Sequence, residues 1–352
     1  MPQDSTLAVD ALLFADPDGF TDNEPVDLTG PQTGADRIVE AFLLAATVFS
    51  GLVVTLVAVF VLQKGLPALS HSGLAFLTNG GWDGNLESAW EDTGNVIFGA
   101  RPLIAGSLLS TLFALAFTLV LGTGSAIVIT ELAPGWLRRP VEAVVQLLAG
   151  VPSVVFGLVG FALVVPFVTD HVLPADAFDK VPNIPYDGQS LLAAVIVLTF
   201  MILPFFVSVA SDSLRAVPSA LSAGARALGI TRWRTIARVQ IPVALPGLMA
   251  GAVLAAARAI GEAIALSMVA GALALTPGFA HGPLYFALTP IRTMASAIVD
   301  TGGEAMSIPA IEGALFGLAT LLLALSLCLS LLARWAYAWS AKKLNLTNDR
   351  DV

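Results

Sequence analysis

The sequence of 352 residues predicts an all-α membrane protein with six transmembrane helices. Its residues are 56% hydrophobic and only 12% charged, and the mean hydropathy is +0.83. Because about a quarter of the residues in a soluble domain are charged, this composition excludes an ordinary soluble fold. The apolar residues also gather into six runs, each long enough to cross a bilayer as a helix of about 20 residues.

Five of these runs contain no charged residue, namely 41–63, 102–130, 143–169, 188–211 and 313–333. The remaining run, 243–269, is interrupted by Arg258 and Glu262. Glycines and prolines inside the runs, as at Gly150 to Pro152, are common in membrane helices and as a set also suit a transport pathway. We expect one membrane domain, residues 41–336. Its predicted spans are about 41–63, 102–130, 143–168, 190–211, 246–269 and 311–334.

The net charge of −9 is concentrated in residues 1–40, which hold nine acidic residues and one basic residue. This segment lacks the basic start and apolar centre of a secretory signal, so we expect a disordered, acidic cytoplasmic tail without a partner of its own. Residues 337–352 are expected to form a second tail.

Lysines and arginines predict the orientation, because positively charged loops stay in the cytoplasm. With the N-terminus inside, twelve of them lie in cytoplasmic segments and four in outer loops. We therefore expect a multi-pass protein of the cell membrane with both termini in the cytoplasm, and no interaction with nucleic acid.

Several kinds of site are excluded by the residues present. A single cysteine excludes a disulfide framework, and three scattered histidines without a metal-binding spacing indicate no metal site. The chain also lacks the glycine-rich GxxxxGK[ST] loop that binds nucleotide phosphates. We expect no catalytic residues and no cofactor in this chain.

The longest cytoplasmic loop, residues 213–242, predicts two short helices. Pro218 suits the first turn of the first helix, Gly229 suits a helix end, and Thr231 can cap a second helix that runs toward Pro242. Helical spacing predicts a mostly apolar face on the second helix, formed by Trp233, Ile236, Ala237 and Gln240, with Arg234 and Arg238 on another face. Such a hairpin would present an aromatic side chain and a basic rim to a cytoplasmic protein or to anionic lipid.

Arg258 and Glu262 lie in the middle of the fifth span if that span is a continuous helix from Leu248 to Met268. About 15 Å of helix would then separate Arg258 from each interface. The two side chains would share a face at i,i+4 spacing and could form an ion pair. In one interpretation, this pair only lowers the cost of inserting the span into the membrane. Because a charged residue at this depth costs roughly 2.5 to 3.5 kcal/mol, a functional role is the better hypothesis. Arginine matches phosphate oxygens with a fork of donors, and Glu262 could compete for it and assist release of the anion.

Small residues recur every fourth position along the same span, at Gly247, Gly251, Ala255, Ala259 and Ala263. This spacing allows close helix packing. Packing within the chain and packing against a second subunit both remain open.

The loop resembles the EAA signature of ATP-binding-cassette (ABC) importer permeases, because Gly229 is followed after nine residues by Val239-Gln-Ile-Pro242. The signature triplet is Ala223-Gly224-Ala225 here and lacks the acidic residue. Residues 217–271 resemble the phosphate-specific permeases. The runs Phe98 to Ser107, Thr130 to Pro134 and Gln146 to Gly157 point to the PstC type more than to PstA.

This resemblance implies the six-helix type I ABC importer permease (MetI-like) fold, with the loop as the coupling segment that docks the ATPase. It implies a PstA-like second permease, two ATPase subunits that bind ATP and Mg, and an external phosphate-binding protein. Arg258 and Glu262 would fall on the substrate pathway of the family. The implied docking residues are Ala223, Gly224, Ala225, Gly229, Arg232, Trp233, Arg234 and Pro242. A PstA-type subunit, a permease for another oxyanion, and an ion-coupled transporter or channel are the alternatives.

Overall fold

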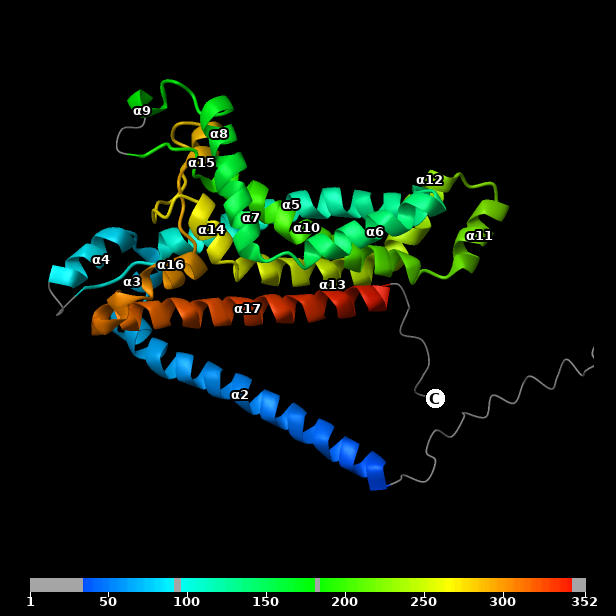
Figure 1. The fold of residues 1–352 in the computed structure, drawn as a ribbon, viewed down its shortest axis with the longest axis horizontal. Coiled ribbons are helices and arrows are strands. Elements are labelled where there is room, and N and C mark those ends of the chain that lie inside the picture. Colours follow the sequence, from blue (N-terminus) through cyan, green and yellow to red (C-terminus); the bar gives the residue numbers. More distant parts are fainter. Residues whose placement is uncertain (1–33, 92–95, 181–183, 344–352) are drawn as a thin grey trace, which may run out of the picture. The chain divides into compact units, whose positions relative to one another are not determined.

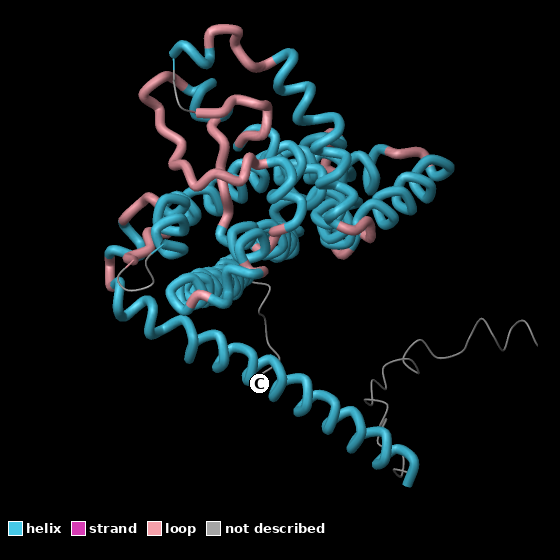
Figure 2. Tube along the Cα trace, turned by 60° about the vertical axis from the view of Figure 1, so that its left-hand side comes forward, coloured by secondary structure: helices cyan, strands magenta, loops and turns pink. Residues whose placement is uncertain are grey.

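The computed structural model describes residues 34–91, 96–180 and 184–343, and the regular secondary structure of these residues is helical (Figure 1). Within these residues the structure has no strand, only an isolated bridge between Gly271 and Ile291 (Figure 2). The chain divides at Val57 into two compact units, so the first half of the first helix is described by itself. The helices are α2 (Gly34–Ser72), α3 (Ala75–Thr78), α4 (Trp82–Glu91), α5 (Arg101–Ile127), α6 (Gly135–Ala149), α7 (Ser153–Val159), α8 (Val165–His171), α9 (Ala177–Lys180), α10 (Leu191–Arg215), α11 (Ser219–Ala227), α12 (Arg232–Thr235), α13 (Ile241–Ile260), α14 (Ile264–Val269), α15 (Pro283–Leu288), α16 (Met294–Thr301) and α17 (Pro309–Lys343), with π-helical segments η2 (Val128–Leu132), η3 (Gly160–Val164) and η4 (Ile236–Gln240) and the 3-10 helix η5 (Glu304–Ser307).

The prediction of an all-α protein with six membrane spans is confirmed. Among the described residues, six helical segments are long and apolar enough to cross a membrane. They are Arg37–Ser72, Arg101–Leu132, Ser153–His171, Leu191–Arg215, Arg232–Ile260 and Pro309–Leu332.

The terminal helices extend beyond the predicted spans. Helix α2 begins at Gly34, so residues 34–40, which were assigned to a disordered tail, are helical. Helix α17 likewise continues to Lys343 and takes in the first part of the predicted C-terminal tail. In both places the sequence contains no proline or glycine that would stop the helix after it has started. Residues 1–33 and 344–352 of the two predicted tails lie outside the described residues.

The third span is broken where the sequence reads Gly150-Val-Pro152. Helix α6 ends at Ala149, Pro152 has an extended backbone, and the apolar candidate span begins only at Ser153. A proline disfavours helical backbone in the residue before it, which explains why the predicted helix 143–168 does not continue through this point.

The fifth span differs at both ends from the predicted helix 246–269. It is already helical at Arg232, because η4 leads directly into α13, and it stops at Ile260. Pro242 does not interrupt it, because the proline comes directly after the π-helical segment Ile236–Gln240, where the regular i→i−4 hydrogen-bond pattern is already interrupted. Gly261 ends the helix, and the short α14 follows after Ala263. Arg258 therefore lies near the end of a helix and not in the middle of one.

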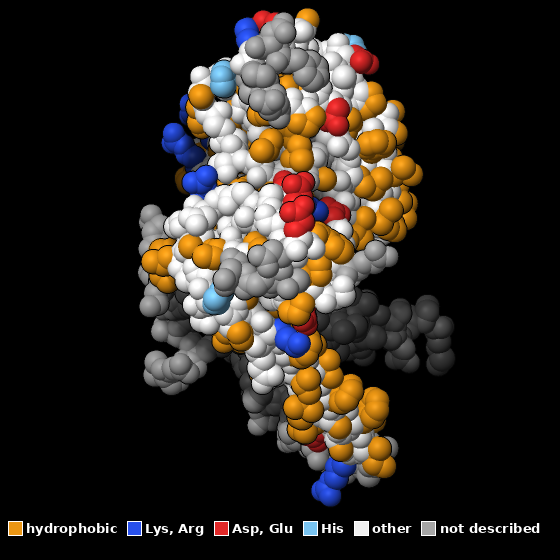
Figure 3. All heavy atoms as spheres, turned by 90° about the vertical axis from the view of Figure 1, so that its left-hand side faces the viewer, with side chains coloured by type: hydrophobic (Ala, Val, Ile, Leu, Met, Phe, Trp, Pro, Cys, Tyr) orange, Lys and Arg blue, Asp and Glu red, His pale blue; other side chains and the backbone are white. Residues whose placement is uncertain are grey.

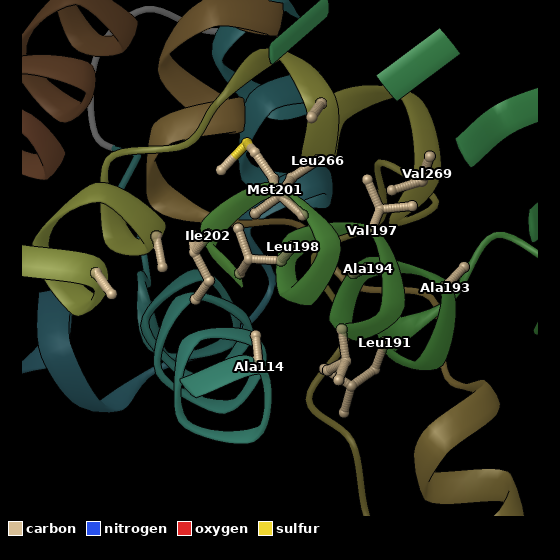
Figure 4. Packing of buried hydrophobic residues seen from close by; sticks show 14 of the residues in the cluster. Ala114, Leu191, Ala193, Ala194, Val197, Leu198, Met201, Ile202, Leu266 and Val269 are labelled. Carbon is tan, nitrogen blue, oxygen red and sulfur yellow. The ribbon is translucent and has the colours of Figure 1, made fainter. Parts of the chain in front are cut away.

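Helix α10 is the centre of the larger apolar core. Its buried side chains, among them Leu198, Met201 and Ile202, pack against Ala114 of α5 and Leu266 of α14 (Figure 4). Two members of the small-residue stripe on α13 also face α10. A Cβ atom added at Gly247 would overlap Ser213, and one at Gly251 would lie 3.0 Å from Val209. The stripe thus packs within the chain at these two positions.

Gly122 of α5 provides a direct test of this packing. A Cβ atom at this position would overlap the ring of Phe206, which is fully buried on α10. Overpacking a core typically costs about 1–3 kcal/mol, so Gly122→Ala is expected to lower the thermal unfolding midpoint of the detergent-solubilised protein. Gly124→Ala is the matched control, because nothing lies within 4 Å of its added Cβ. Equal midpoints for the two variants would contradict the packing.

Candidate functional site

Arg258 is exposed on α13, on the same face as Leu254, which is 52% exposed. Among the described residues, none forms a hydrogen bond or an ion pair with its guanidinium group. Helix α13 packs along α17, and α17 continues well past the end of α13 that carries Arg258 (Figure 1). This places Arg258 beside the apolar part of a membrane span. Because an arginine facing hydrocarbon is costly, the exposed face of α13 needs a water-filled path or another protein beside it.

Glu262 has a different role from the predicted partner of Arg258. Its side chain is buried, and Oε1 accepts a hydrogen bond from the backbone N–H of Ala265 at 3.0 Å. No ion pair joins Glu262 to Arg258 in the part of the chain that the structure describes. The i,i+4 relation fails because α13 ends at Ile260, and the carboxylate instead satisfies a free N–H in the first turn of α14.

The loop 213–242 contains the first predicted short helix, but the second is not short, because α12 runs without a break through η4 into α13. Helix α11 ends at Ala227, Gly229 adopts a left-handed conformation with φ of +74°, and Thr231 precedes α12. Glycine adopts this conformation without the steric cost that a side chain would add. We call residues 216–240, which comprise α11, α12 and η4, the coupling hairpin. Of the predicted docking residues, Ala223, Gly224, Gly229, Arg232, Trp233 and Arg234 are exposed, Pro242 is half-buried and Ala225 is buried.

The predicted apolar face of the second helix is correct for Ile236 and Gln240, which are buried, and wrong for Ala237 and for Trp233, which is 64% exposed. Thr235 is buried instead. The π-helical segment 236–240 does not keep the 3.6-residue spacing on which the prediction rests. The indole therefore projects from the surface together with Arg232 and Arg234.

Polar contacts that no sequence pattern predicted connect the inner side of the coupling hairpin to η2, which directly continues α5. Nε2 of Gln240 donates to Oε1 of Glu131 at 3.0 Å and to Oγ of Ser222 at 3.1 Å. Arg138 donates to the carbonyl oxygens of Ile129 and Thr130, at the end of the same span. The one available signal was the presence of polar Glu131 and Gln240 next to apolar runs.

A second polar cluster lies at the opposite end of the helices. Arg292 is largely buried and pairs with Asp83 at 3.3 Å and with Asp300 at 3.6 Å. Asp300 also accepts a hydrogen bond from Ser267 at 2.6 Å. Acidic side chains gather near the centre of this face (Figure 3). No spacing in the sequence relates these residues, so Arg292 was counted only as an outer-loop base.

A hollow of about 480 Å³ lies between the end of α2 and the start of α17, away from Arg258. Its lining includes Lys64 and Glu312, which form an ion pair at 3.0 Å. Neither Arg258 nor Glu262 lines this hollow. The exposed arginine on α13 therefore identifies the candidate path, and the volume of this hollow does not. A path formed between two subunits would be open to one side in a single chain.

The chain is similar in sequence to membrane components of known transport systems. Residues 118–346 match the family described as binding-protein-dependent transport system inner membrane component. The phosphate transport system permease protein PstC of Mesorhizobium japonicum is 34% identical over 77% of this chain and 80% of its own length. PstC 1 of Mycobacterium tuberculosis is 33% identical over 69% and 75% of the two chains, and the probable ABC transporter permease YqgH of Bacillus subtilis is 36% identical over 63% and 67%.

The family match begins within α5 and covers the later described spans, including the coupling hairpin and Arg258. With the six apolar helices, they confirm a multi-pass membrane protein with the fold of an ABC importer permease, a type of protein that works with an ATPase and a binding protein. The chain therefore belongs to the family of binding-protein-dependent transport system inner membrane components, and within it to the PstC permeases.

Proposed function

We propose that this chain is the PstC-type permease subunit of an ATP-driven phosphate importer, and that Arg258 contacts the anion during its passage. The observation that carries the proposal is the exposed, unpaired guanidinium on a membrane-spanning helix. A guanidinium keeps its charge at every physiological pH and offers paired donors to phosphate oxygens. Its exposed face requires an aqueous or protein neighbour, as a transport path would supply.

Glu262 contributes to this proposed path because it stabilises the break between α13 and α14. Its carboxylate holds the first turn of α14 and thereby fixes the backbone four residues after Arg258. The small residues around the break, Gly261 and Ala263, leave room beside the arginine. We assign Glu262 a positioning role, which replaces the competition with the anion that helical spacing alone had favoured.

The partners follow from the same proposal. A PstA-like permease would cover the exposed face of α13, two ATPase subunits would bind ATP and Mg, and an external phosphate-binding protein would deliver the anion. In this arrangement the coupling hairpin and both termini face the cytoplasm, where the arginines lie, and this chain itself carries no catalytic residue. The exposed Trp233 with its two flanking arginines is the surface offered to an ATPase.

Uptake of labelled phosphate by the reconstituted complex tests this function. We expect uptake that requires ATP and that excess unlabelled phosphate suppresses, while sulfate and molybdate leave it nearly unchanged. Stronger suppression by sulfate or molybdate would assign the chain to another oxyanion. Uptake by this chain alone, without an ATPase, would contradict an ATP-driven importer and favour an ion-coupled transporter or channel.

A further inference from the structure

The contact between Gln240 and Glu131 joins the coupling hairpin to η2, which directly continues α5. Gln240 is buried at the end of η4, and its Nε2 atom bridges Glu131 of η2 and Ser222 of α11. Ser222 is also buried, and its carbonyl oxygen accepts a hydrogen bond from Arg226 one turn later. A single amide group therefore connects α11 and η4 with η2, although Glu131 and Gln240 are 109 residues apart in the sequence.

Glu131 and Gln240, whose side chains are hydrogen-bonded to each other, both lie in π-helical turns. Residues 128–132 widen the end of the second span, and residues 236–240 widen the start of the fifth. Such wide turns are uncommon and frequently occur at functional sites. Here the two turns bring Glu131 and Gln240 into contact, and Gln240 also contacts Ser222 of α11.

At its other end, α5 contacts the segment that carries Arg292. Oγ of Ser107 accepts a hydrogen bond from the backbone N–H of Met294 at 2.8 Å, and both residues are buried. Gly106 lies directly against the carbonyl oxygen of Arg292, since a Cβ atom there would overlap it. The helix between these ends is uninterrupted from Arg101 to Ile127.

We infer that Gln240 and Glu131 form a joint through which movement of the coupling hairpin is passed to α5, and through α5 to the segment around Arg292. This inference rests on the proposed function, because it assumes that an ATPase moves the coupling hairpin. Glu131 and Gln240 are positioning residues, which contact neither the anion nor ATP. A displaced hairpin would pull or push α5 along its axis only while the hydrogen bond between the two side chains holds.

Exchanging the two side chains tests the joint. Gln240→Glu places two carboxylates against each other and removes the hydrogen bond. Glu131→Gln keeps an oxygen that accepts from Gln240, so it is the conservative control. The double variant Glu131→Gln/Gln240→Glu restores a donor and an acceptor in exchanged positions. A merely structural role would lower the amount of assembled complex and leave the phosphate taken up per ATP hydrolysed unchanged.

Two measurements on the assembled complex report coupling. The first is the ATP-induced fluorescence change of a dye attached through Gly303→Cys in a Cys328→Ala background; residue 303 is exposed just beyond α16. The second is phosphate taken up per ATP hydrolysed. We expect Gln240→Glu to lower both by at least about fivefold, the lower end of typical coupling effects. Glu131→Gln and the double variant are expected to stay within about twofold of the wild type.

A double variant no better than Gln240→Glu would overturn the joint, as would an unchanged Gln240→Glu. If Gln240→Glu does not assemble, Glu131→Ala removes the acceptor instead and must show the same loss, or the joint is contradicted. The fluorescence change does not depend on the identity of the cargo. Absence of phosphate uptake by the wild type would therefore contradict the proposed function, while the fluorescence change would still decide the joint.

Discussion

Replacing Arg258 with glutamine is expected to lower phosphate uptake by about 10- to 100-fold while the complex still assembles. Hydrogen bonds to charged groups contribute roughly 1.5–3 kcal/mol, and each 1.4 kcal/mol corresponds to about a factor of ten. The loss is confined to transport because no residue of the described chain depends on Arg258 for a hydrogen bond or an ion pair. Initial rates of ATP-dependent uptake in proteoliposomes, normalised to the amount of assembled complex, measure the effect.

Three further substitutions make this result interpretable. Arg258→Lys keeps the charge without the planar fork and is expected to retain part of the uptake. Glu262→Gln keeps an oxygen for the N–H of Ala265, so it should preserve the helix break and most of the activity. Arg334→Gln, at an exposed arginine of α17, serves as the control for loss of one positive charge. Normal uptake by Arg258→Gln would remove this residue from the pathway.

Replacing Trp233 with alanine is expected to weaken binding of the ATPase subunits by roughly 30-fold or more. Tryptophans at the centre of protein interfaces often contribute 2 kcal/mol or more, and this side chain is 64% exposed on the coupling hairpin. Because Trp233 contacts little within the chain, the permease itself should fold normally. Titration of the purified ATPase onto the permease in nanodiscs gives the affinity.

Trp90→Ala is the matched control for Trp233→Ala. Trp90 is 56% exposed but lies on α4, at the end of the helices away from the coupling hairpin. We expect this substitution to leave ATPase affinity unchanged. Equal affinities for the wild type and Trp233→Ala would show that the ATPase docks elsewhere.

The number of spans and the coupling hairpin were predictable because they depend on local properties. Runs of apolar residues set the spans, and the left-handed turn at Gly229 follows from the conformational freedom of glycine. The turn position needed no knowledge of tertiary contacts. For the same reason, the break at Gly150 to Pro152 was visible in the sequence, although it was not assigned to a particular helix boundary.

The errors arose where tertiary contacts or unusual helical geometry decide the structure. Helical periodicity assigned Trp233 and Ile236 to one face, but Ile236 packs inside the protein and Trp233 is exposed, because packing decides which side of the helix is covered. Spacing also paired Arg258 with Glu262, because nothing in the sequence showed that the helix ends between them. Gln240 and Glu131 are 109 residues apart, and Arg292 and Asp83 are 209 residues apart, so no local pattern predicts these pairs. Of these partners, only Asp300 lies near Arg292 in the sequence.

The central claim is that Arg258 faces the path of the anion, and thiol labelling of Arg258→Cys in a Cys328→Ala background tests it most directly. A water-soluble methanethiosulfonate reagent that adds an ammonium group should react with the introduced thiol in the assembled complex. Phosphate should slow this reaction, and the added positive charge should restore part of the lost uptake. Reaction only with a lipid-soluble maleimide, unaffected by phosphate, would show that position 258 faces lipid and would contradict the account.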